Sequence, residues 1–109
     1  MSVTETGRVA PLSVDADHCA FRVVQEGVTN ALRHAAGGAV TIHLDHGDGG
    51  LDVTVSSVGW RHASTYGGTG RGLAGLRERL VRLGGDLDTR RSDDASFVLH
   101  ARIPAGGSA

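Results

Sequence analysis

The sequence is marked first by what it lacks. Its 109 residues contain no lysine, two prolines and a single cysteine, so all 11 basic residues are arginines. The lone Cys19 excludes an internal disulfide, and no Cys/His spacing typical of a zinc site is present. Its small and apolar helical neighbours predict a buried, inert thiol. Together with 17 glycines and abundant alanine, the missing lysine looks like GC-rich coding rather than a functional signal.

Long apolar runs are also absent. No stretch approaches the ~20 residues that span a bilayer, and the N-terminus does not resemble a signal peptide. The formal net charge is −1, so no large charge imbalance points to nucleic acid or to an anionic membrane. We therefore expect a cytoplasmic protein without nucleic-acid or membrane contacts, folded as one domain over residues 1–109 with an ordered core of about 8–104.

Residues 17–36 hold the strongest pattern in the chain. Apolar side chains recur there at i, i+3, i+4 and i+7, the period of a core-facing helix. Asp15 or Asp17 is predicted to cap its start, and Gly37 with Gly38 to end it.

The other stripe of this helix carries Glu26 and Asn30, one turn apart. A carboxylate and an amide oxygen on one face can hold Mg²⁺ beside a phosphate. The alternative is a solvated face on which Glu26 pairs with Arg22 at i−4 and Asn30 is merely tolerated.

The remaining patterns predict a small sheet and a second helix. Residues 1–6 are expected to be loose, and 8–14 to form an edge strand marked by Pro11. Alternation at 40–45 and 51–55 around a turn at 46–50 predicts a hairpin. A helix with Leu73, Leu76, Leu80 and Leu83 on one face closes at Gly84 and Gly85, and strands follow at 86–90 and 97–103. The arginines of this helix (Arg77, Arg79, Arg82) and Glu78 are predicted to form a solvated face.

These elements favour an α+β fold, a two-layer sandwich with both helices on one face of a mixed, mostly antiparallel sheet. Two stretches also indicate a family: VVQEGVTNALRHA in the first helix and GTGRGLAGLRERLVRLGG at the second. In this order and spacing they resemble the ATP-binding catalytic domain of bacterial sensor histidine kinases, in the branch of NarL/DesK-like kinases. That domain has the Bergerat-type fold of the GHKL (HATPase) superfamily, shared with gyrase, Hsp90 and MutL.

The resemblance implies a binding site for ATP and Mg²⁺. It assigns Glu26 a catalytic role near the γ-phosphate and Asn30 coordination of Mg²⁺, with Arg33 or His34 facing the phosphates. Glycines at a helix start let the backbone approach a phosphate. The family's phosphate-binding glycine box falls on the segment opening the second helix, with Gly75 allowing close packing. That segment comprises Gly70, Arg71, Gly72 and Leu73.

The adenine-binding motif departs from the family pattern D-x-G-x-G. Gly59 is kept, but Ser57 stands where the family aspartate accepts a hydrogen bond from the adenine amino group, and Arg61 replaces the last glycine. Losing a charge-assisted hydrogen bond of ~1.5–3 kcal/mol predicts adenine binding weakened roughly 10- to 100-fold. Trp60 either stacks on the base or caps the sheet.

Sequence reasoning therefore predicts an ATP-binding catalytic domain of a two-component sensor kinase with a degenerate adenine motif. About 17 residues precede the first helix, too few for a phosphoacceptor helical hairpin, and His34 is not expected to be the acceptor. The expected partners are a nucleotide and a histidine phosphoacceptor/dimerisation domain or a response regulator. The alternatives are a non-catalytic interaction module (pseudo-kinase or anti-sigma-like) and a plain Mg-nucleotide hydrolase.

Overall fold

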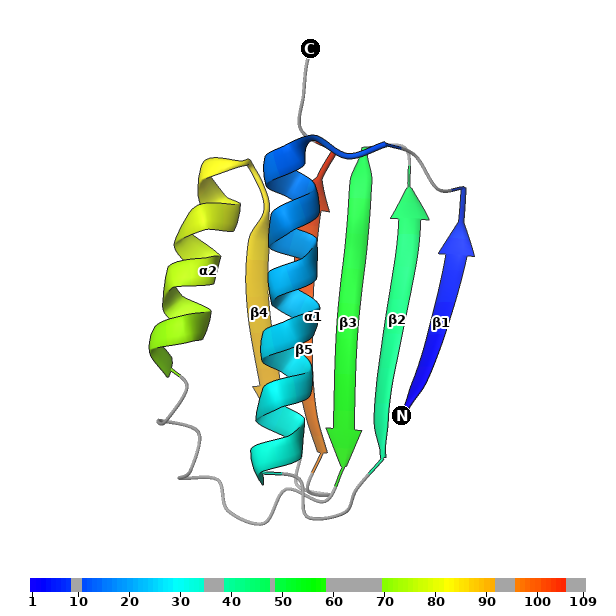
Figure 1. Ribbon diagram of the computed structural model, residues 1–109, viewed down its shortest axis with the longest axis vertical. Coiled ribbons are helices and arrows are strands. Elements are labelled where there is room, and N and C mark those ends of the chain that lie inside the picture. The colour runs from blue at the N-terminus through cyan, green and yellow to red at the C-terminus, as the bar shows by residue number, and fades with distance from the viewer. Residues whose placement is uncertain (9–10, 35–38, 48, 59–69, 92–95, 106–109) are drawn as a thin grey trace.

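A five-stranded sheet with both helices on one face forms the domain (Figure 1). The computed structural model describes residues 1–8, 11–34, 39–47, 49–58, 70–91 and 96–105, with the backbone alone at 32–34, 70–72 and 91. In chain order the elements are β1 (Ser2–Gly7), α1 (Val14–His34), β2 (Val40–Gly47), β3 (Gly50–Val58), α2 (Gly70–Arg82), β4 (Asp86–Arg91) and β5 (Ser96–Pro104).

The sheet is mixed. Its strand order is β1-β2-β3-β5-β4, with β1 parallel to β2 and all other neighbours antiparallel. The predicted two-layer α+β sandwich, the hairpin of β2 and β3 and the two amphipathic helices are therefore confirmed. No helix among the described residues is both long enough and apolar enough to cross a membrane.

The N-terminal residues depart from expectation. Residues 1–6 were predicted to be loose, but β1 is an edge strand whose register on β2 runs from Ser2 opposite Thr41 to Gly7 opposite His46. The strand predicted at 8–14 is wrong, because the described part of that segment leads into α1. Every residue of β1 is exposed, so no burial pattern marks this strand in the sequence.

Side-chain contacts with β2 hold β1 in place. The hydroxyl of Thr6 donates to Asp45 Oδ1 at 3.0 Å, and His46 Nε2 lies 2.6 Å from Glu5 Oε2. The parallel backbone pairing and these polar contacts, rather than a buried apolar face, attach the strand. A hydrophobic-period argument cannot detect such a strand.

The start of α1 is set by Ser13 rather than by either aspartate. The Ser13 hydroxyl accepts a hydrogen bond from the Ala16 N–H at 3.1 Å, the geometry of an N-cap. The predicted caps, Asp15 and Asp17, instead lie in the first turn, where carboxylates complement the helix dipole. The predicted stop at Gly37 and Gly38 lies outside the described residues.

The end of α2 follows its prediction. Gly84 has φ +89°, a left-handed conformation that favours glycine. Its N–H donates to the carbonyl of Val81 at 3.0 Å, and the N–H of Gly85 reaches back to Leu80 O at 2.8 Å. These two bonds form a Schellman motif, which satisfies the last carbonyls of the helix.

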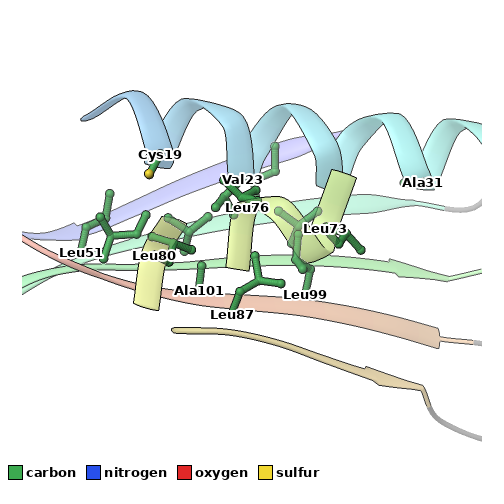
Figure 2. Packing of buried hydrophobic residues seen from close by; sticks show 14 of the residues in the cluster. Cys19, Val23, Ala31, Leu51, Leu73, Leu76, Leu80, Leu87, Leu99 and Ala101 are labelled. Carbon is green, nitrogen blue, oxygen red and sulfur yellow. The ribbon is translucent and has the colours of Figure 1, made fainter. Parts of the chain in front are cut away.

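The hydrophobic core lies between the helices and the sheet. Figure 2 shows Val23 of α1 and Leu73, Leu76 and Leu80 of α2 packed over strand residues. Cys19 is fully buried in the same layer, as predicted for an inert thiol. The buried apolar residues are Ala16, Cys19, Val23, Ala31, Val40, Ile42, Leu51, Val53, Val55, Leu73, Leu76, Leu80, Leu87, Phe97, Leu99, Ala101 and Ile103.

Close packing of a helix on the sheet depends on Gly27, not on Gly75. A Cβ atom added at Gly27 would lie 2.9 Å from Cγ2 and 3.0 Å from Cβ of Val55, so α1 approaches β3 too closely for a side chain. The packing role predicted for Gly75 is wrong for the described residues, because a Cβ there would meet none of their atoms within 4 Å.

These two helical glycines predict opposite effects of the same substitution. Gly75→Ala should raise the free energy of unfolding by about 0.5–1 kcal/mol, because alanine has the higher helix propensity and no contact opposes it. Gly27→Ala has the same propensity gain but forces a β-branched neighbour to shift, which costs typically ~1–3 kcal/mol. Urea unfolding of both variants measures the difference, and equal effects would contradict the close approach.

Candidate functional site

The candidate site is built where α1 and β3 end together. At Gly27 and Val55 the helix and strand are in near contact, and both run toward the same end of the molecule (Figure 1). Asn30 follows three residues later on α1 and Ser57 two residues later on β3, advances of about 4.5 Å and about 6.6 Å. Two polar residues predicted separately from sequence therefore lie at one end of the helix–sheet interface.

Asn30 is buried, which its assignment to a polar stripe did not anticipate. Its residue exposure is 1%, yet neither Oδ1 nor Nδ2 has a hydrogen-bond partner among the described residues. Leaving a buried amide unsatisfied costs about 1–3 kcal/mol. The sequence held a signal of this burial, because Asn30 follows the core residue Val23 by seven positions and so lies on the same helical face.

Glu26 lies one turn before Asn30 and is only partly exposed, with 19% of its side chain accessible. Its Oε1 is 3.6 Å from Arg22 Nη2, as the i−4 pairing alternative predicted. Arg22 also donates to Gln25 Oε1 at 3.0 Å. A long, partly exposed pair of this kind contributes about 0–1 kcal/mol, so it does not prevent Glu26 from turning to another partner.

Ser57 is the second buried polar residue among those described, with 4% exposure. It lies on the helix-facing side of β3, two residues beyond Val55, between Val40 of β2 and Phe97 of β5 in the strand register. Its hydroxyl can donate one hydrogen bond and accept others, but unlike a carboxylate it carries no charge. Gly59, Trp60 and Arg61 of the predicted adenine motif lie outside the described residues.

The predicted phosphate-binding segment begins α2. The helix starts at Gly70, and the first N–H groups of a helix have no intrahelical acceptor, which favours an anion there. Leu73 was predicted as a ligand-binding residue, and its side chain is 5% exposed in the core, so only its backbone remains for a ligand. The side chains of Arg33, His34 and Arg71 lie outside the described part of the chain.

The donor set at this end fits a divalent cation that brings its own oxygen ligands. No group of three or more His, Cys, Asp or Glu side chains capable of holding a metal occurs in the described residues. The chain therefore offers Asn30 Oδ1 and the neighbouring carboxylate of Glu26 rather than a complete cage. Mg²⁺ is characteristically held this way, by one or two protein oxygens together with phosphate and water.

Comparisons with known proteins show the family of the chain. The profile of the family described as histidine kinase-, DNA gyrase B- and HSP90-like ATPase matches residues 15–106. The oxygen sensor histidine kinase NreB of Staphylococcus carnosus is 29% identical over 86 residues, 77% of this chain. The signal transduction histidine-protein kinase/phosphatase UhpB of Salmonella typhimurium is 39% identical over 67 residues, 62% of this chain.

Solved structures show the same fold. The catalytic domain of histidine kinase ThkA superposes with a TM-score of 0.75 at 19% identity, covering 96% of this chain and 77% of that one. The histidine kinase domain of the blue-light activated kinase EL346 of Erythrobacter litoralis gives 0.73 at 24% identity, covering 95% and 54%.

The fold and the site define an ATP-binding domain of the type found in histidine kinases. With a match over residues 15–106, this chain belongs to the family of histidine kinase-, DNA gyrase B- and HSP90-like ATPases. It spans 25% of the length of NreB and 13% of UhpB, so it corresponds to one part of those longer proteins.

Proposed function

We propose that this domain binds ATP with Mg²⁺ and supplies the phosphoryl group to a histidine located outside these 109 residues, as the catalytic domain of a sensor kinase. The observation that carries the proposal is the buried amide of Asn30 at the common end of α1 and β3, which has no partner in the described part of the chain. An orphaned buried polar group is costly in a free protein, and a ligand that pairs with it would remove that cost.

Each residue has a role that follows from its position. Asn30 Oδ1 would ligate the metal, and its Nδ2 would donate to a phosphate oxygen. Glu26 would act one turn earlier, as a base or by orienting water or the metal, while the start of α2 would receive the phosphates. Because phosphoryl transfer depends on positioned charge more than on covalent chemistry, this small set of groups is sufficient for it.

The remaining expectations are part of the same proposal. The GRGLAGLRERL segment supports membership in the NarL/DesK-like branch, whose partners would be a phosphoacceptor/dimerisation domain and a response regulator. A domain that uses ATP in this way would work in the cytoplasm.

The second candidate is a non-catalytic interaction module with the same fold. It is favoured by one observation, the uncharged Ser57 in the position where the family places an aspartate. Calorimetric titration with ATP and ADP, with and without Mg²⁺, separates the two candidates. Metal-dependent binding supports the catalytic domain. If neither nucleotide binds up to about 1 mM, which corresponds to a binding free energy of only about −4 kcal/mol, the non-catalytic interaction module is supported instead.

We predict that the chain by itself does not become phosphorylated. His18 precedes Asn30 by twelve helical residues, or about 18 Å along the axis. On the sheet, His46 contacts Glu5 of the edge strand and His100 contacts Asp52. Transfer requires the nucleophile in near contact with the γ-phosphate, and none of these histidines is placed there.

Incubation with Mg-ATP labelled at the γ-phosphate tests this expectation. The label should be absent from the chain alone and should appear on an added helical phosphoacceptor domain as an acid-labile, base-stable product. Stoichiometric label on any histidine of the chain would contradict the proposed division of labour.

A further inference from the structure

A groove lies at the opposite end of the helical layer from Asn30. It has a volume of about 390 Å³ and is bounded by the first turns of α1 and the last turns of α2. Its lining residues are Asp15, His18, Arg79, Arg82 and Leu83. Figure 1 shows these two helix ends side by side, at the end of the domain where α1 begins.

Positive charge exceeds negative charge in the groove, as far as the described residues show. Arg77, two residues before Arg79, donates to Asp86 Oδ1 at 3.0 Å, but neither Arg79 nor Arg82 has an ion pair with any described residue. Asp15 lines the same groove, yet it forms no ion pair within 4.0 Å in the described part of the chain. Two guanidinium groups thus face one carboxylate in this groove, and Glu78 adds a second carboxylate on the adjoining surface.

The charge of Arg79 acts on the buried thiol of Cys19 in α1. Burial raises the pKa of the Cys19 thiol, and the nearby guanidinium of Arg79 opposes that rise, while Asp15 adds to it. The side chain of Arg79 is nevertheless exposed, as is that of Arg82, so both guanidinium groups are accessible to a partner. Arg77, Glu78, Arg79 and Arg82 are all exposed, as predicted for a solvated face.

An apolar surface continues the groove along α2. A second hollow, of about 420 Å³, is lined by Arg77, Glu78, Val81 and Arg82. Val81 is 54% exposed, and Arg82 lines both hollows. Arginine beside an exposed apolar side chain is a composition enriched at protein interfaces. An inorganic anion would pair with the arginines but would have no use for the apolar side chain.

We propose that this groove, together with the adjoining surface around Val81, is a docking site for an acidic segment of a partner protein. Carboxylates of the segment pair with Arg79 and Arg82, since guanidinium groups bind carboxylates in bidentate geometry. An apolar side chain of the segment covers Val81. The site is about 18 Å from Asn30 along α1, so it does not depend on nucleotide binding.

Fluorescence anisotropy with a synthetic probe tests the proposal. The probe is a labelled twelve-residue helical peptide with glutamates and leucines on one face, and its control has glutamine at each glutamate. We expect saturable binding of the glutamate peptide, about tenfold weaker binding of the glutamine peptide, and weakening with added salt. Amide NMR shifts should change at His18 and at residues 79–83 and remain unchanged at Asn30 and Ser57.

Charge reversal supplies the matched variants. Arg82→Glu and Arg79→Glu should each weaken the glutamate peptide about tenfold or more, whereas Arg90→Glu makes the same change in net charge at an exposed position on β4 and should leave affinity within about twofold. Arg82→Gln provides a milder variant if a reversal fails to fold. Equal weakening by Arg90→Glu, no saturable binding, or displacement of the peptide by inorganic phosphate at equal concentration would overturn the proposal.

Discussion

Asn30→Leu is expected to make the domain more stable while removing the metal-dependent part of its nucleotide affinity. Leucine has a similar volume and has no polar atoms to leave unsatisfied in a site that is 1% exposed. Removing an unsatisfied buried amide should raise the free energy of unfolding by about 1–3 kcal/mol. For a domain of this size each kcal/mol corresponds to a Tm rise of about 4–8 °C.

The opposite signs of the two effects make this variant informative. If Asn30 has no role in binding, Asn30→Leu should raise stability and leave nucleotide affinity unchanged. If Asn30 is a metal ligand, the substitution should raise stability and also remove the metal-dependent affinity. Thermal unfolding of the free protein measures the first effect, and titration with ATP in the presence and absence of Mg²⁺ measures the second.

Asn30→Asp serves as the matched control. It keeps an oxygen ligand, so metal-dependent nucleotide binding should persist, but it places an unpaired carboxylate in a buried site and should lower the stability of the free protein. If Asn30→Leu destabilised the domain instead, the amide would have a partner in the free protein, and the ligand-based account of its burial would fail.

Ser57→Asp is expected to tighten ATP binding by about 10- to 100-fold. The substitution restores a charged acceptor at the position that the resemblance assigns to binding of the adenine amino group, and such a hydrogen bond contributes about 1.5–3 kcal/mol. Because Ser57 is 4% exposed, the new carboxylate should also lower the stability of the free domain, with saturating ATP restoring part of the loss.

Ser57→Ala and a change of base provide the controls. Alanine should bind ATP no more tightly than the natural serine does, and the gain from aspartate should be smaller for a nucleotide whose base lacks the amino group, such as ITP. Affinities of the wild type and Ser57→Asp within a factor of two for ATP would show that this position does not contact the base.

Local patterns in the sequence were sufficient for most elements. The apolar period of 3.6 that includes Val23 identified α1, and the leucines of α2 with Gly84 after them identified the second helix and its Schellman end. Alternation with period two identified the hairpin of β2 and β3. These signals are readable because burial on one face leaves a periodic trace in the residues of a single segment.

Other features arise from contacts between segments and leave no such trace. The polar edge strand β1 is defined by its pairing with β2, so its residues carry no burial pattern. The choice of Ser13 over Asp15 as the N-cap depends on where the chain enters the helix. Likewise, only the approach of α1 to Val55 distinguishes the glycine that must stay small, Gly27, from Gly75, which faces open space.

The site divides in the same way. The sequence by itself determined which residue types occur one turn apart on α1, Glu26 and Asn30, and where α2 begins. Only the tertiary structure decided that Asn30 is buried with no partner among the described residues and that Ser57 lies at the same end of the interface. The physical reason is that a helix period fixes which side chains share a face, whereas burial depends on what that face is packed against.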